Sequence, residues 1–351
     1  MQRTLSAALV VAFLFCRGAS AQDGFPGAEW DHVSPAQLGW SEAGLSEVRS
    51  WAQTNATAVM VVHHGSVVME WGDTAKRTGL ASARKSLLSA LIGIAVADRK
   101  ISLDSTLAQL GIDDNPPSLT AVEKQATVRM LLEARSGIYH PALYETASMA
   151  KRRPERGSHA PGTFWYYNNW DFNALGTIYE QATGTGIYDA IDRQIARPIG
   201  MQDYRPADGT YFTGASSIHR AYPLRMSARD LARFGLLYLR KGTWAGRQIV
   251  PQDWVRESTR SYSDVGDAAS SPGQGYGYLW WVAQPASWGR MFSDGSYFAH
   301  GNGGQYAIVD PADDLVVVSR VDLDRHLPST SQSDIAQLFR LTLKAGSPAA
   351  H

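Results

Sequence analysis

A serine and a lysine three residues apart stand directly before a long apolar stretch. Ser82 and Lys85 enclose an alanine and an arginine, and residues 86–96 are almost all apolar or small. Helical residues i and i+3 lie on one face, so both side chains would project together at the start of a buried helix. A lysine whose pKa is lowered by burial or by nearby positive charge can remove the proton of a serine hydroxyl. The pair therefore predicts a serine acyl-transfer site that does not depend on histidine.

The same four-residue spacing occurs a second time in the chain. Ser148 and Lys151 are followed by a charged segment, residues 152–156, that contains a proline. No apolar helix stands behind this second pair to desolvate its lysine. Because the pattern is loose and matches by chance, its context decides the interpretation. We predict that Ser148 is a surface loop residue.

Length and charge exclude some classes of protein. The chain has 351 residues and a formal net charge of +0. This length is enough for one large domain with a sizeable core. The neutral balance offers no reason to propose nucleic acid as a partner.

The N-terminus has the pattern of an export signal. Arg3 precedes an apolar run over residues 5–15, and small residues lead up to Ala21. We predict a signal peptide of residues 1–21, cleaved after Ala21, with a run too short to span a bilayer. Cys16 is the only cysteine, so the mature protein would have no disulfide. The expected location is the periplasm or the medium, with no stable membrane anchor.

Strand patterns occur near both ends of the chain, with mostly helical patterns between them. The predicted strands cover residues 58–63, 67–71, 277–282, 297–300, 306–309 and 315–321; the predicted helices cover 41–53, 82–96, 127–133, 172–182, 227–240, 253–259 and 332–344. The economical arrangement is an α+β fold in which one antiparallel sheet takes strands from both termini and packs against the terminal helices. We predict a single catalytic domain, residues 22–351, made of an α/β part (about 30–104 and 276–345) and a largely helical insertion (about 105–275). A cleft between the two parts would hold the active site.

An aromatic loop offers partners for the lysine. Residues 161–170 contain a Tyr and an Asn two apart in two registers, Tyr167 with Asn169 and Tyr166 with Asn168. Residues two apart point the same way on an extended segment. A phenol beside a lysine can share a proton with it, and an amide can orient the lysine. Both registers fit this role.

A glycine-rich segment near the C-terminus offers a place for an oxyanion. It begins at His300 and continues through Asn302 and Gly303 to a predicted strand. Glycines in a strand let another backbone approach closely, and a backbone N–H there can stabilise a developing oxyanion.

Taken together, these segments resemble the serine hydrolases related to class C β-lactamases, which include DD-peptidases, 6-aminohexanoate-oligomer hydrolases and β-lactamase-like carboxylesterases. The family order is S-x-x-K, then Y-x-N, then a K/H-x-G strand, and this chain has that order. Further segments are similar to family landmarks: residues 131–137, 161–163, 226–234 and 275–281. The spacing from Pro161-Gly162-Thr163 to the following Tyr, Asn and Gly matches the family with Tyr167 and Asn169.

The resemblance implies a role for each residue. Ser82 is the nucleophile, Lys85 with Tyr167 is its base, and Tyr167 protonates the leaving group. Asn169 orients Lys85. The Ser82 N–H and one further N–H in the segment from His300 to Gly303, that of Asn302 or of Gly303, hold the oxyanion. No metal or cofactor is implied.

The substrate class is narrowed by departures from the family pattern. His300 stands where β-lactamases usually have a lysine, and Asn302 stands where the pattern has glycine. We therefore favour carboxylic esters or linear amides over the alternatives, a β-lactam or a D-amino-acid peptide (as for a DD-carboxypeptidase). A more remote alternative is a non-catalytic binding or sensor protein on the same fold.

Other chemistries lack their sequence signatures. The chain has no G-x-S-x-G for a Ser-His-Asp hydrolase and no H-E-x-x-H for a zinc site. His63 and His64 are adjacent, so they would point to opposite faces of a strand. Arg152, Arg153 and Arg156 could bind an anionic substrate, although a solvated loop is the favoured interpretation.

Overall fold

The computed structural model describes residues 24–265, 274–284 and 292–346. The predicted signal peptide, residues 1–21, and Cys16 lie outside the described residues. Within those ranges, no helix is both long enough and apolar enough to cross a membrane.

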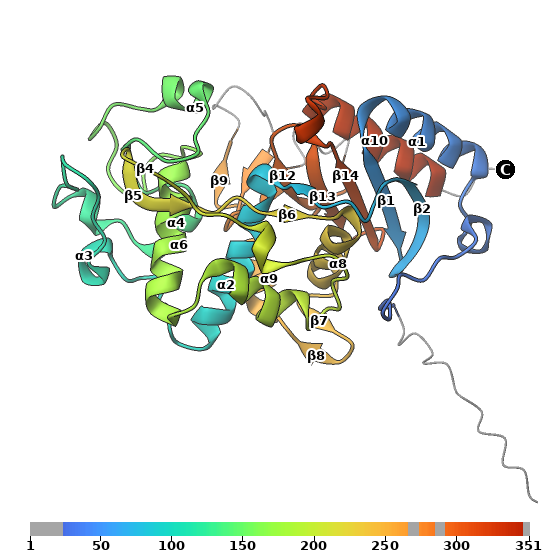
Figure 1. Cartoon of the computed structure of the whole chain (residues 1–351), viewed down its shortest axis with the longest axis horizontal. Coiled ribbons are helices and arrows are strands. Elements are labelled where there is room, and N and C mark those ends of the chain that lie inside the picture. Colours follow the sequence, from blue (N-terminus) through green and yellow to red (C-terminus); the bar gives the residue numbers. More distant parts are fainter. Residues whose placement is uncertain (1–23, 266–273, 285–291, 347–351) are drawn as a thin grey trace, which may run out of the picture.

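An eight-stranded antiparallel sheet forms the centre of one half of the molecule (Figure 1). Its strand order is β2-β1-β14-β13-β12-β11-β10-β9, so strands from the two ends of the chain are neighbours. The strands are β1 (Ala58–His63), β2 (Ser66–Gly72), β9 (Ser263–Asp264), β10 (Gln274–Tyr276), β11 (Trp281–Ala283), β12 (Tyr297–Gly301), β13 (Gln305–Asp310) and β14 (Leu315–Arg320). The predicted α+β fold with one antiparallel sheet is confirmed.

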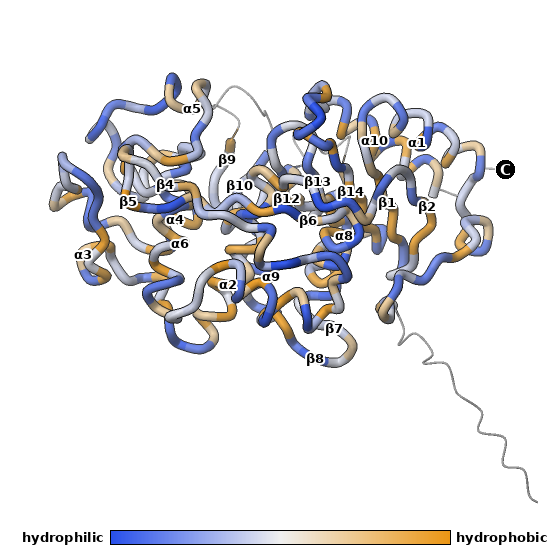
Figure 2. Tube along the Cα trace, in the orientation of Figure 1, coloured by the Kyte–Doolittle hydropathy of each residue, from blue (hydrophilic) through white to orange (hydrophobic). Residues whose placement is uncertain are grey.

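Strand β1 is buried on both faces of the sheet, which explains why it is an almost continuous apolar run. In β1, Val59 and Val61 point into one core cluster, whereas Met60 and Val62 point into the other. Successive side chains of a strand point to opposite faces, so both sets must be apolar here. Figure 2 shows β1 and β2 as hydrophobic segments beside the terminal helices.

The two terminal helices cover one face of the sheet. Helix α1 (Glu42–Asn55) packs against α10 (Gln332–Gly346), and the two lie side by side in Figure 1. The Ser41 hydroxyl caps α1 by accepting a hydrogen bond from the Gly44 amide at 3.2 Å. Both helices agree with the helices predicted over residues 41–53 and 332–344.

Helix α2 (Arg84–Ala97) follows a short 3₁₀ turn, η2 (Ala81–Ala83), and is buried almost along its whole length. It contacts the strand β12 and the helices α6, α7 and α9. A helix that is apolar all round belongs in a core, as the sequence of residues 86–96 predicts. The nucleophile candidate therefore stands at the junction of the sheet with the helical half.

The helical half contains short strands as well as helices. Its helices are α3 (Leu107–Leu110), α4 (Val128–Leu132), α5 (Ala147–Arg152), α6 (Asn169–Thr183), α7 (Ile187–Ile191), α8 (Ala228–Leu239) and α9 (Gln252–Ser258). Its strands form three pairs: β3 (Thr78–Gly79) with β6 (Arg225–Met226), β4 (Phe212–Gly214) with β5 (Ser217–Ala221), and β7 (Thr243–Trp244) with β8 (Arg247–Gln248). Helix α8 lies against β13 and β14 and covers the second face of the sheet.

The strand predicted over residues 277–282 is wrong for residues 277–280, and only residues 281 and 282 lie in a strand, β11. The chain turns back over residues 277–280, because the Gly277 amide donates to the Trp280 carbonyl and Leu279 has a φ of 62°. A Cβ at position 277 would lie 2.2 Å from the Ser258 carbonyl oxygen. The turn separates β10 from β11, and it places Trp281 at the start of β11.

Ser148 is exposed, as predicted, but it lies in a helix and not in a loop. Helix α5 begins after Thr146, whose hydroxyl accepts a hydrogen bond from the Met149 amide at 3.2 Å. This cap stabilises a single short helix in a polar segment.

Candidate active site

Ser82, Lys85 and Tyr167 form one hydrogen-bonded group. Lys85 Nζ lies 2.7 Å from Ser82 Oγ and 2.9 Å from Tyr167 Oη. The 3₁₀ turn and the first turn of α2 bring Ser82 and Lys85 to one side, and the segment before α6 supplies Tyr167. The structure thus brings together the three residues that the sequence singled out.

The Lys85 amine is held in an environment that disfavours its charged form. Its side chain is 2% exposed, and Nζ lies 4.8 Å and 4.9 Å from the ring centroids of Tyr167 and Phe172. Burial, and then the positive charge of Arg84, lowers the pKa of Lys85 well below its usual value. The amine can therefore accept a proton at a pH where a free lysine is protonated.

The Tyr167 hydroxyl is a proton donor near neutral pH. Burial raises the pKa of Tyr167 to about 12, although the Ser82 hydroxyl and the charge of Arg84 oppose this shift. The ring stacks on Trp281 with 5.5 Å between centroids, which fixes its direction. The other tyrosine, Tyr166, donates to the Met149 carbonyl at 2.9 Å instead. Of the two registers, only Tyr167 contacts Lys85.

Asn169 makes no hydrogen bond to Lys85, so the contact by which we predicted it to orient the lysine is absent here. Asn169 is the first residue of α6 and lines the cavity, and its Nδ2 donates to the Tyr144 carbonyl at 2.7 Å. Tyr144 has a φ of 62°, so the Asn169 amide holds a turn of the loop that forms one wall of the cavity. Its neighbour Asn168 caps α6 by accepting from the Trp170 amide at 3.1 Å.

Strand β12 brings the glycine-rich segment against η2 (Ala81–Ala83), the nucleophile turn that carries Ser82. His300 lines the cavity and stacks on Tyr306 with 4.3 Å between ring centroids. Burial, and then the charge of Lys85, lowers the pKa of His300 to about 3, so the imidazole is neutral. Asn302 also lines the cavity, whereas Gly303 has a φ of 84° and turns toward Leu323. Of the two predicted oxyanion donors, Asn302 is the one at the cavity wall.

Gly301 sets the distance between β12 and the nucleophile turn. A Cβ at this position would lie 2.2 Å from the Leu80 carbonyl oxygen and 3.0 Å from the Ala83 amide nitrogen. We expect Gly301→Ala to push the turn away and to lower kcat by on the order of 10²-fold, since a misplacement of about 1 Å has effects of that size. Overpacking should also lower the free energy of unfolding by about 1–3 kcal/mol.

The matched control for this variant is Gly79→Ala, because a Cβ added to Gly79 would have no neighbour within 4 Å and this residue has no positive φ. Ester hydrolysis and thermal unfolding of both variants would be compared with the parent protein. Unchanged activity of Gly301→Ala would contradict the close approach that the structure indicates.

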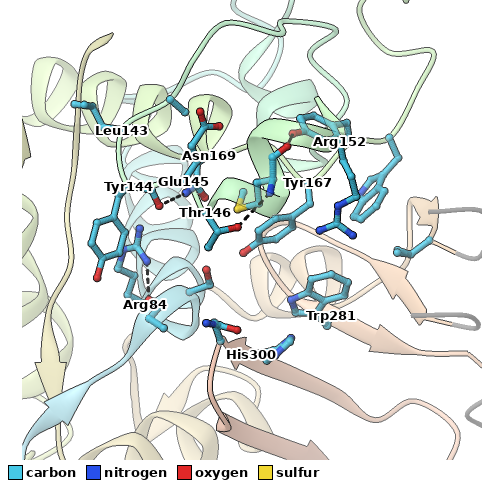
Figure 3. Close-up of a pocket in the computed structure, with 18 of the residues that line it drawn as sticks. Arg84, Leu143, Tyr144, Glu145, Thr146, Arg152, Tyr167, Asn169, Trp281 and His300 are labelled. Carbon is cyan, nitrogen blue, oxygen red and sulfur yellow. Dashed lines mark hydrogen bonds between the residues drawn. The ribbon is translucent and has the colours of Figure 1, made fainter. Parts of the chain in front are cut away.

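Ser82 and Tyr167 line a cavity of about 970 Å³, which Figure 3 shows in close-up. Three of its lining residues, Tyr144, Phe164 and Phe212, expose 40–48% of their surface despite being large and apolar. Further aromatic walls come from Trp165, Tyr166, Tyr167 and Trp281. Pockets of this size and composition suit organic molecules with sizeable apolar groups.

The three arginines of the predicted loop have different environments. Arg153 pairs with Glu145, and Arg156 pairs with Glu123 at 2.8 Å. Arg152 lines the cavity, and its Nε donates to the Ser148 carbonyl at 3.3 Å. Arg152 is exposed, as the solvated-loop interpretation predicts, and of these three arginines it is the one that lines the cavity.

The sequence singled out neither Arg84 nor Trp281. Arg84, which stands between Ser82 and Lys85 in the sequence, lines the cavity. The Trp281 ring stacks on the Tyr167 ring. A charged residue before an apolar helix was a signal that could have identified Arg84.

No metal site is evident among the described residues, since no cluster of three or more His, Cys, Asp or Glu side chains occurs there. His63 Nδ1 accepts a hydrogen bond from the Trp40 indole at 3.1 Å, and His64 pairs with Asp314 at 2.7 Å. Both histidines thus have structural partners.

The chain is similar to known proteins in sequence and in fold. The family model described as Beta-lactamase matches residues 47–321. An uncharacterized protein of Alkalihalophilus pseudofirmus is 22% identical over 296 residues, which cover 75% of this chain and 83% of that protein. A proposed 6-aminohexanoate-dimer hydrolase from Bacillus anthracis has a TM-score of 0.65 at 19% identity, covering 93% of this chain and 90% of that one. EstCE1, described as a hydrolase with promiscuous acyltransferase activity, has a TM-score of 0.59 at 15% identity, with 88% and 98% covered. At 19% and 15% identity, the likeness to these two solved structures shows a shared fold.

Proposed function

Because this chain belongs to the beta-lactamase family of class C-like serine hydrolases, we propose that it hydrolyses uncharged carboxylic esters or linear amides through an acyl-enzyme on Ser82. The observation that carries this proposal is the chain of contacts from Ser82 Oγ through Lys85 Nζ to Tyr167 Oη, at 2.7 and 2.9 Å. A nucleophile, its base and a proton donor are thereby within reach of one another.

The proposed reaction has two halves. Lys85 takes the proton of Ser82 while Oγ forms a bond to the substrate carbonyl carbon, and the carbonyl oxygen becomes an oxyanion. The Ser82 N–H and the Asn302 or Gly303 N–H stabilise that oxyanion, each with an effect of about 3–4 kcal/mol on the barrier. Tyr167 gives its proton to the departing alkoxide or amine and regains one from Lys85. A water molecule then attacks the acyl-enzyme by the same proton path and releases the acid.

Two features support an uncharged substrate with an apolar group. The neutral His300 offers no positive charge where β-lactamases usually have a lysine. The exposed rings of Tyr144, Phe164 and Phe212 offer apolar surface at the cavity instead. Burying such a group of the substrate contributes about 25 cal/mol per Å² of apolar surface.

A β-lactam or a D-amino-acid peptide is the second candidate substrate, and Arg152 favours it. In the described part of the chain Arg152 has no carboxylate partner, and it lines the cavity (Figure 3). An arginine in this position can bind the carboxylate that both substrate types carry.

Direct comparison of substrates tests the proposal. The panel contains p-nitrophenyl esters of increasing acyl length, the 6-aminohexanoate dimer, a D-alanyl-D-alanine peptide and nitrocefin. We expect kcat/KM for the best ester to exceed that for nitrocefin by at least about tenfold, a difference of ~1.4 kcal/mol in transition-state binding. Fast nitrocefin turnover with negligible ester cleavage would instead support the second candidate.

We also propose that the protein is exported. The predicted signal of residues 1–21 supports this location. Fractionation of cells that express the full chain, with sequencing of the mature N-terminus, would test it: a mature chain that begins at Gln22 is expected, and an uncleaved cytosolic chain would contradict it.

A further inference from the structure

Arg84 is a buried cation at the floor of the cavity, next to the nucleophile. Its residue is 1% exposed, and its guanidinium lies 5.2 Å from the ring centroid of Tyr144 and 4.9 Å from that of Tyr222. In the described parts of the chain, no carboxylate forms an ion pair with Arg84. Burying a charge without a counter-charge lowers the free energy of unfolding, so a buried arginine of this kind is expected to have a function.

The guanidinium is bonded to the backbone beside the nucleophile. Arg84 Nη1 donates to the Ala81 carbonyl at 2.6 Å, the bond drawn at Arg84 in Figure 3. Ala81 has a φ of 47°, which lies in the left-handed region that residues other than glycine rarely adopt. A conformation of this kind persists only when surrounding contacts hold it.

The carbonyl that Arg84 holds belongs to the same peptide group as the Ser82 amide. In a planar trans peptide the C=O and the N–H point in opposite directions, so a bond to one fixes the direction of the other. Ser82 is the second residue of its 3₁₀ turn, and the first amides of a helical turn have no acceptor within it. The Ser82 N–H is therefore free to meet a substrate oxygen. A charge-assisted bond to the carbonyl also polarises the peptide and strengthens that N–H as a donor.

We propose that Arg84 is a positioning residue: its guanidinium holds the Ala81–Ser82 peptide so that the Ser82 N–H faces the oxyanion of the substrate. This inference rests on the proposed function, because it assigns to that amide the stabilisation of the acyl-transfer transition state. Arg84 itself does not touch the reacting atoms.

The charge of Arg84 has a second consequence for the same site. The groups that face Lys85 are Ser82, Tyr167 and His300, and none of them is an anion at neutral pH. On the packed helix α6, Asp171 is bonded to Ser136 and Asn168, and burial raises its pKa well above its usual value. On α7, Tyr188 is likewise a neutral phenol. Replacing Arg84 by a neutral residue should therefore raise the pKa of Lys85 and move the acid limb of the pH–rate profile to higher pH.

Binding of a substrate carboxylate is a different role for Arg84, and its kinetic effects differ from those of a positioning residue. Arg84 Nε and Nη2 are buried without a hydrogen-bond partner. These two N–H groups are parallel and match the two oxygens of a carboxylate, so a substrate carboxylate that displaced the Tyr144 ring could bind them. A binding role of that kind would change KM for anionic substrates and leave kcat for neutral esters unchanged.

The test compares Arg84→Met, Arg84→Lys and Arg233→Met in the full chain. Arg233 is the matched control: it is a buried arginine that donates to the Ile199 carbonyl at 3.0 Å and lies 5.3 Å from the ring of Trp30. With a neutral p-nitrophenyl ester, Arg84→Met should lower kcat by on the order of 10²-fold with little change in KM, the effect of a weakened oxyanion donor. Arg84→Lys should recover part of this loss, and the kcat of folded Arg233→Met should stay within a few-fold of the parent value.

A crystal structure of Arg84→Met supplies a measurement that does not depend on turnover. We expect Ala81 to leave its left-handed conformation and the Ser82 N–H to turn away from the cavity. An unchanged Ala81 φ would overturn the proposal, and so would an effect confined to KM for substrates with a carboxylate. Full activity of Ser82→Ala would refute the proposed function. The backbone of the Arg84→Met structure would still show whether Arg84 holds the Ala81–Ser82 peptide.

Discussion

Replacing Ser82 with alanine is expected to lower kcat by on the order of 10⁴-fold or more, the loss typical when the nucleophile of an acyl-transfer enzyme is removed. The variant has no Oγ to form the acyl bond, and Lys85 has nothing to deprotonate. Ester hydrolysis by purified protein gives the rate. Labelling with a fluorophosphonate, which marks activated serines, followed by mass spectrometry should find the adduct on Ser82 in the parent protein only.

The chain supplies its own control for this experiment. Ser148→Ala changes the serine of the second S-x-x-K sequence, which is exposed on α5 and lies outside the cavity lining. Its activity and its labelling should equal those of the parent protein. Both variants should keep the parent thermal unfolding temperature, because neither substitution leaves a large cavity. Normal hydrolysis by Ser82→Ala would refute the assigned nucleophile.

The parts of the site that could be predicted are those that depend on local periodicity. Ser82 and Lys85 meet because a helical turn brings residues i and i+3 together, and the apolar stretch behind them indicates burial. The strands β1 and β14 were likewise predicted from β-branched apolar runs at the two ends of the chain. Each of these features is encoded within about ten neighbouring residues.

Features that depend on loop geometry could not be predicted in this way. Asn169 bonds to Tyr144, which lies 25 residues away in the chain and has a positive φ that no local pattern indicated. The direction of the Arg84 side chain depends on the Tyr144 and Tyr222 rings, from two separate segments. The apolar pattern also predicted a strand over residues 277–282, where the backbone instead turns at Leu279, whose φ is 62°.

Burial of Lys85, the base in the proposed reaction, links the proposed activity to stability. Its pKa in the folded protein lies well below the usual value of 10.5, mainly because of burial. Between the folded pKa and pH 10.5 the unfolded chain therefore binds a proton that the folded chain does not, and folding must release it. This cost grows as the pH falls from 10.5 to the folded pKa and is constant below it, so Lys85 lowers stability at neutral pH. A group that costs stability and is nevertheless buried is expected at a functional site.

Lys85→Met is accordingly expected to separate activity from stability. The methionine keeps a similar volume but cannot accept the Ser82 proton, so kcat should fall by on the order of 10³-fold. Thermal unfolding at pH 7 should occur at the parent temperature or above it, because the cost of deprotonating a buried amine is removed. In the parent protein kcat/KM should fall as the pH drops through the lowered Lys85 pKa, since the ammonium form is no base. The residual activity of the variant should lack this acid limb of the pH–rate profile.

Lys151→Met, at the exposed second S-x-x-K sequence, should change neither kcat nor the unfolding temperature. A Lys85→Met protein that unfolds at a much lower temperature, or that keeps its activity and its acid limb, would show that the lysine is structural and that another group is the base.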